Sequence, residues 1–192
     1  EGEEPTIEEM RAAIRKGTGQ DAGGELFEIT YEGYGAGGVA IIVETATDNK
    51  NRTVAEVRHA FTKFGGAMGE SGSVAFQFDR MGVITLDKEK YADEETVMNM
   101  ALEAGAEDVQ DEGDVWEVRT AMGDFNTVRE TLEAEGVEML EAQLAMVPRM
   151  QNPIDAETAK KLVRLTDALE DLDDVQNVFT NADFPEDFDP EA

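Results

Sequence analysis

The stretch at residues 31–64, YEGYGAGGVAIIVETATDNKNRTVAEVRHAFTKF, decides the fold of this chain. Residues 39–43 form a near-continuous apolar run, which predicts a strand covered on both faces. The glycines before this run indicate a tight turn from an earlier strand, and TDNKN at 47–51 is typical of a polar turn. Apolar residues then recur at helical spacing over 53–64, and the glycines at 65–66 end that helix.

The residues around this stretch predict a sheet that stays incomplete until the end of the chain. Before Gly82 the pattern supplies one helix and only three strands, expected at residues 26–31, 39–43 and 74–78. Such a half-built unit exposes sheet edges and an apolar helix face. A helix at 155–169 and a strand at 175–179 would complete it. This predicts a discontinuous domain formed by residues 21–81 and 149–181.

Residues 82–148 are expected to form a second domain, inserted in the first. LEAGAEDV at 102–109 and LEAEGVEM at 132–139 both predict a helix end, a glycine and a strand start, 30 residues apart. That spacing is the size of one α–β unit. The helices are expected at residues 93–104 and 125–134, and the strands at 83–86, 107–110, 115–120 and 140–147. The fold class is therefore α+β, with two ferredoxin-like-type α/β sandwich domains, the second inserted in the first.

The two ends of the chain have patterns of their own. Ile7, Met10 and Ile14 fall at helical spacing, and KGTG at 16–19 ends this helix. A single helix cannot bury its own apolar face, so it docks on the domain after it or belongs to a domain upstream. Residues 182–192 are acidic, contain two prolines and are predicted to form a frayed tail.

Composition excludes several classes of site. The 192 residues include no cysteine, which excludes disulfides, thiol catalysis and thiolate metal sites. No apolar run approaches the ~20 residues of a membrane span, so no membrane contact is expected. The net charge of −28 repels nucleic acid unless positive charge is strongly localised. The simpler explanation of this charge is a highly solvated surface. The alternative is that a basic segment outside this chain balances it.

No motif supports catalysis or a cofactor. GYGAGG at 33–38 has the letters of a dinucleotide-binding loop, but a strand comes after it where a helix is needed, so an inter-strand turn is favoured. GESGS at 69–73 is interpreted as a structural loop, with a backbone anion nest as the alternative. His59 is the only histidine, and the acidic run ALEDLDDV at 168–175 lacks calcium-loop spacing. We predict no catalytic residue, no metal site and no cofactor.

The best surface signal is a basic cluster in the opening stretch. At 100° per residue, Val57 and Phe61 share one helix face, and the polar side chains fall on the other. Between residues 48 and 66 the chain carries four Lys and Arg against two Asp and Glu. We predict that this cluster contacts nucleic acid or a ribosome, the alternative being an ordinary solvated helix face. Its members are Lys50, Asn51, Arg52, His59 and Lys63.

Five segments of the chain, in order, resemble the YebC/PmpR family, which includes the mitochondrial translational activator of cytochrome oxidase subunit one. They are TYEGYGAGGVAIIVE, TDNKNRTVAEVRHAFTKFGG, SGSVAFQF, ALEAGAEDV and LTDALEDLDDVQNVFTNAD. Ala36 and Phe179 depart mildly from the residues usual in the family. The family opens with a basic helical domain, and the resemblance implies that EEMRAAIRKGTG at 8–19, within residues 1–20, is the last helix of that domain.

The resemblance implies a cytoplasmic, non-enzymatic regulator of gene expression. Family members are named transcriptional regulators, and others act in translation on ribosomes that stall in proline-rich stretches. Two functions are therefore expected: transcription regulation with DNA binding by the full-length protein, or alternatively a ribosome-associated translation factor. The implied partners are DNA or ribosomal RNA, contacted mainly through the basic N-terminal domain, and the ribosome.

Overall fold

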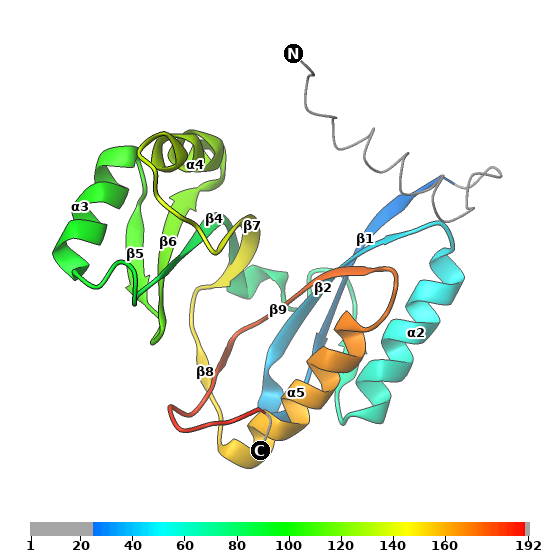
Figure 1. Ribbon diagram of the computed structural model, residues 1–192. Helices are drawn as coiled ribbons and strands as arrows, with labels where there is room; N and C mark the ends of the chain where they lie inside the picture. Colours follow the sequence, from blue (N-terminus) through cyan, green and yellow to red (C-terminus); the bar gives the residue numbers. More distant parts are fainter. Residues whose placement is uncertain (1–24, 191–192) are drawn as a thin grey trace. The chain divides into compact units, whose positions relative to one another are not determined.

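The computed structural model describes residues 25–190, and these divide into two compact units (Figure 1). The first unit takes its described residues from 25–75 and 152–190, and the second consists of residues 76–151. The helix expected within residues 1–20 lies outside the described residues. None of the helices in residues 25–190 is both long and apolar enough to cross a membrane.

The first unit is a four-stranded antiparallel sheet with two helices on one face (Figure 1). The strand order is β3-β1-β2-β9, formed by Ala67–Gly69, Phe27–Tyr34, Ala40–Thr47 and Val175–Thr180. The helices are α2, Lys50–Lys63, and α5, Ala156–Glu170. Val57 and Phe61 of α2 pack with Leu162 and Leu165 of α5 on the apolar strand β2. The central place of β2 explains its apolar run.

The path from the first unit to the second differs from the prediction. Residues 74–78 are not a strand of the first sheet, because Ala75–Gln77 is a 3-10 turn and β4, Phe78–Asp87, belongs to the second sheet. The missing strand is β3, which is too short to give a periodic signal in the sequence. Gly82 lies in the middle of β4, so the predicted boundary falls too late in the chain.

The second unit has the ferredoxin-like pattern that the sequence predicts. The element order β4-α3-β5-β6-α4-β7 gives an antiparallel sheet with the strand order β5-β6-β4-β7. Its core packs both helices against one sheet face and includes the buried Trp116. The elements after β4 are α3 Glu94–Ala104, β5 Asp108–Asp111, β6 Val115–Ala121, α4 Phe125–Ala134 and β7 Glu141–Pro148. The α+β class is confirmed.

Two local features complete the first unit. The glycine-rich segment is a short 3-10 turn between β1 and β2, with positive φ at Gly37 and Gly38, so the predicted inter-strand turn is confirmed. Near the end of the chain, β10, Ala182–Asp183, pairs with β8, Asn152–Pro153. The Phe184 ring then stacks on Phe188 at 5.6 Å, so the prediction of a frayed tail is wrong for this segment.

Candidate nucleic-acid interface

Helix α2 orients the predicted contact residues. Its first turn is capped by the Asn49 side chain, which accepts a hydrogen bond from the Arg52 backbone N–H at 3.1 Å. Val57 and Phe61 are fully buried beneath the helix. The opposite face therefore points to solvent, and all five predicted contact residues are exposed, namely Lys50, Asn51, Arg52, His59 and Lys63. The helix begins at Lys50, three residues earlier than predicted.

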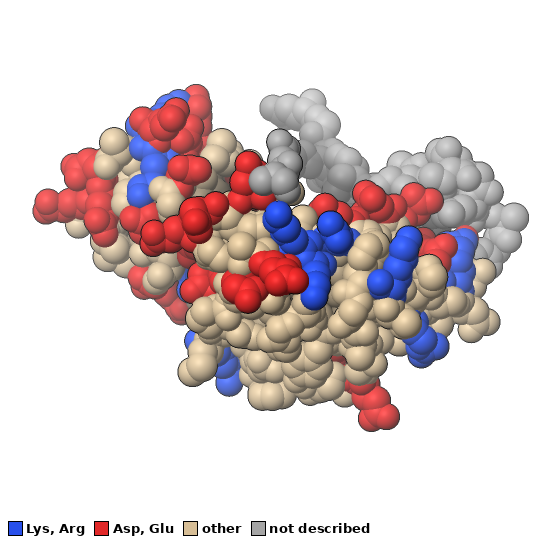
Figure 2. Space-filling view, turned by 90° about the horizontal axis from the view of Figure 1, so that it is seen from below, with Lys and Arg blue, Asp and Glu red and all other residues tan. Residues whose placement is uncertain are grey.

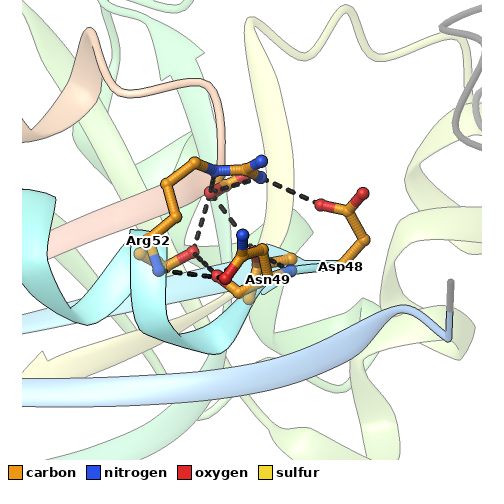
Figure 3. Close-up of polar contacts among 6 residues, drawn as sticks. Asp48, Asn49 and Arg52 are labelled. Atoms are coloured by element: carbon orange, nitrogen blue, oxygen red, sulfur yellow. Dashed lines mark hydrogen bonds and ion pairs between the residues drawn. The ribbon is translucent and has the colours of Figure 1, made fainter.

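Arg52 is not a free cation (Figure 3). Its guanidinium donates to Asp174 Oδ1 at 3.0 Å and to Asp48 Oδ1 at 2.9 Å. Asp174 is 9% exposed and also accepts the Thr53 hydroxyl at 2.7 Å. The hydrogen bonds from Arg52 to the Asp174 and Asp48 carboxylates raise the pKa of Arg52. The charge of Arg52 is therefore compensated within the unit, where the ion pair ties α2 to the segment after α5, so Arg52 is less available to a partner than the other predicted cations.

The surface beside Arg52 is acidic rather than basic. A hollow of about 280 Å³ is lined by Arg52, Glu56, Leu172 and three aspartates, Asp171, Asp173 and Asp174. Partial desolvation of the Glu170 carboxyl and the nearby Asp167 and Asp171 raise its pKa. A polyanion is repelled at this end of the helix layer. Among residues 25–190, no group of three or more metal-binding side chains is suited to hold a metal ion.

The two predicted lysines of α2 keep their charge available. The Lys50 ammonium lies over the Phe27 ring at 4.1 Å, and Lys63 lies over the Phe64 ring at 5.4 Å. These contacts orient the side chains without neutralising them. His59 and Asn51 stand on the exposed side of the same helix. His59 and Lys63, one turn apart, thus share the solvent-facing side of α2, whereas Lys50 lies at the helix start over Phe27 of β1.

Four further cations belong to this helix layer and were missed by the sequence analysis. They are Arg58 of α2 and, on α5, Lys160, Lys161 and Arg164, all of them exposed. The two helices hold all seven Lys and Arg of the first unit's described residues, with four Asp and Glu, a net charge of +3. The same unit as a whole has seven against eighteen, a net charge of −11. Arg58 was counted in the charge of residues 48–66 but not named as a contact, and a charge count over the predicted helix at 155–169 would have found the other three.

The surface drawing agrees with this count. In Figure 2 the Lys and Arg side chains of the first unit form separate patches on an otherwise largely uncharged surface. The second unit, in contrast, is dominated by carboxylates in the same figure. Positive charge on the first unit is therefore local, as binding to phosphate by so acidic a chain requires.

The GESGS loop is structural. The backbone N–H groups of Gly72, Val74 and Ala75 converge at 2.6–3.0 Å on the carboxylate of Glu32, which is 4% exposed. A backbone nest is thus present, but its anion is a side chain of β1. Burial opposes ionisation of Glu32, yet these three hydrogen bonds outweigh it and lower the Glu32 pKa. The loop is therefore held by an internal anion.

Strand β6 of the second unit offers no stacking platform like that of many RNA-binding sheets. Trp116, the only tryptophan, points into the core and donates its ring N–H to the Tyr91 carbonyl at 2.7 Å. On β6 the half-buried Glu117 and Arg119 pair with one another at 2.8 Å. Recognition of unstacked bases depends on exposed aromatic rings, so β6 does not support it.

A family model described as the TACO1/YebC second and third domain matches residues 26–182. A probable transcriptional regulatory protein of Maridesulfovibrio salexigens is 54% identical over 179 residues, which cover 93% of this chain and 72% of the relative. A similarly named protein of Desulforapulum autotrophicum is 50% identical over 177 residues, covering 92% and 71% of the two chains.

A solved structure has the same fold. The crystal structure of a conserved hypothetical protein from Aquifex aeolicus superposes with a TM-score of 0.81 at 44% sequence identity. The match covers 94% of this chain and 74% of that chain. Sequence and structure thus agree over nearly all of the described residues.

Proposed function

Because the chain belongs to the TACO1/YebC family, we propose that it is a cytoplasmic, non-enzymatic regulator of gene expression, and that the full-length protein binds DNA to regulate transcription. The names of its relatives support the regulatory role. The most direct structural support is the helix layer formed by α2 and α5, which has a net charge of +3 in a unit of −11.

The charge distribution sets the kind of binding. Phosphates that touch the helix layer meet exposed lysines and arginines, whereas more distant phosphates meet carboxylates. At physiological salt the repulsion is screened beyond about 8 Å, so the local cations decide the outcome. Binding through this surface is therefore short-ranged, weakened by added salt and insensitive to base sequence.

A second function, a ribosome-associated translation factor that relieves stalls at proline-rich sequences, is favoured by the packing of the two helices. The recognition helix of a sequence-specific DNA-binding protein must enter the major groove, which is about 12 Å wide. Here α2 and α5 pack side by side on the sheet, so neither stands alone to enter a groove. A broad two-helix surface is better suited to the backbone of a folded RNA.

Mobility shifts with promoter-length duplex DNA and co-sedimentation with ribosomes distinguish the two functions. The variant that tests the surface is His59→Glu with Lys63→Glu, because both side chains are exposed and make no ion pair in the described structure. Arg52→Glu is unsuitable, since Arg52 holds the buried Asp174. Weaker association of the double variant with either target supports the proposal. No association of the wild type with DNA or ribosomes contradicts it.

A further inference from the structure

Helix α5 presents a row of cations away from the sheet. Leu162, Leu165 and Leu169 are fully buried beneath it. Lys160 and Arg164 are four residues apart and therefore lie on one face, opposite the leucines. Lys161 stands beside them and is also exposed. The sequence KKLVR thus places three positive side chains on the solvent side of a rigid, well-packed helix.

The antiparallel packing of the two helices adds Lys63 to this row. At one end of the layer, Arg52 near the start of α2 binds Asp174, which lies after α5 in the chain. At the other end, Gly66, just after α2, lies against the Leu165 side chain. The end of α2 is therefore level with the part of α5 around Leu165, next to Arg164. Packed helices lie about 8–10 Å apart, so Lys63 belongs to the same surface as the α5 cations.

Lys160, Arg164 and Lys63 are free of ion pairs, unlike most cations of the second unit, whereas Lys161 interacts electrostatically with Asp155. In residues 25–190 no carboxylate lies within ion-pair distance of Lys160, Arg164 or Lys63. In the second unit, four cations are each paired with a carboxylate: Lys88 with Asp111, Lys90 with Glu138, Arg119 with Glu117 and Arg149 with Asp79. An unpaired row in so acidic a chain is available to external anions.

We propose that the α5 surface, formed by Lys160, Lys161, Arg164 and Lys63, is the main phosphate-binding element and grips the backbone of a nucleic-acid duplex. This inference rests on the proposed function and moves its centre from α2 to α5. Binding of single strands depends on stacking with aromatic rings. Helix α5 contains no aromatic residue, and Phe61 of α2 is buried. The surface thus fits a duplex, whose phosphates are presented on the outside.

The test compares variants of matched charge. Lys160→Glu with Arg164→Glu lowers the net charge of α5 by four units. Lys90→Glu with Arg149→Glu lowers the net charge by the same amount on exposed side chains of the second unit. Fluorescence anisotropy measures the binding of each protein to a duplex DNA, a duplex RNA of the same sequence and the single strands. We expect the α5 variant to weaken duplex binding about tenfold or more and to flatten the salt dependence by about two phosphate contacts.

The outcomes separate this inference from the proposed function. A matched loss in both double variants means that net charge alone drives binding and overturns the inference, as does unchanged binding of the α5 variant. Tighter binding of single strands than of duplexes also overturns it. A wild type that binds no nucleic acid refutes the proposed function itself. The duplex that binds more tightly, RNA or DNA, identifies which nucleic acid this surface contacts. Unchanged circular dichroism of the α5 variant ensures that lost binding is not lost folding.

Discussion

Replacing Arg52 with Glu tests the structural role that the ion pair gives this side chain. The substitution removes the hydrogen bonds to Asp174, whose side chain is 11% exposed, and places a negative charge beside it. Breaking a buried ion pair costs about 3–5 kcal/mol. Because the Arg52 side chain is 39% exposed, solvent screens the pair, and we expect a loss of roughly 1.5–3 kcal/mol. For a unit of this size that lowers Tm by on the order of 10 °C.

The single tryptophan allows the two units to be followed separately. Trp116 lies in the second unit, so its fluorescence reports unfolding of that unit, whereas far-UV circular dichroism reports both. Arg52→Glu should shift only the part of the dichroism transition that belongs to the first unit. The matched control is Lys63→Glu, on the same exposed face, which should change stability by less than about 0.5 kcal/mol.

Equal transitions for Arg52→Glu and Lys63→Glu would refute the structural role of Arg52. In that case Arg52 would be a surface cation as available to a partner as the other predicted contact residues. A shift of the Trp116 transition in Arg52→Glu as large as the dichroism shift would show instead that the two units unfold together.

Three further substitutions test the packing of the first unit. Val57→Ala, at a fully buried position, should cost about 1–3 kcal/mol in thermal unfolding; no change in Tm would place Val57 outside the core. Glu32→Gln replaces one carboxylate oxygen with an NH2 group, which faces a backbone N–H donor and cannot accept its hydrogen bond. We expect a loss of about 1–3 kcal/mol in the free energy of unfolding at pH 7. Since the folded state lowers the Glu32 pKa, the wild-type advantage should be full above pH 4.5 and disappear as the pH falls through the lowered pKa; a pH-independent difference between the unfolding curves would contradict this. Gly33→Ala brings a Cβ within 2.6 Å of the Ala67 carbonyl and should cost about 1–3 kcal/mol, seen as faster hydrogen exchange along β3; unchanged exchange would show that the backbone yields easily.

Periodic patterns in the sequence were sufficient for the long elements. The predicted helix at 125–134 coincides with α4, and the apolar run at 39–43 lies within the central strand β2 and the residue before it. Strand β3 could not be predicted, because its three residues, Ala67–Gly69, are held by pairing with β1 rather than by a pattern of their own. Local periodicity carries no information about such pairing.

The candidate site was predicted only in part. Helical spacing correctly placed His59 and Lys63 on the exposed face of α2. The same spacing could not show that Arg52 is bound by Asp174, because 122 residues separate the two in sequence. Nor could it show that α5 lies beside α2, which joins Arg164 and its neighbours to the surface. Both contacts form only because the chain returns to the first unit after the second unit, and local sequence patterns do not report that tertiary packing.

A titration of the isotopically labelled chain with duplex RNA or DNA, monitored by backbone amide NMR, tests the binding surface most directly. We expect the largest chemical-shift changes in the last turn of α2 and in the part of α5 that carries its cations, around Lys63, Lys160 and Arg164. The changes should fade as salt is raised. Changes confined to the second unit, or centred on the acidic hollow around Asp174, would contradict the assignment of the helix layer as the nucleic-acid contact.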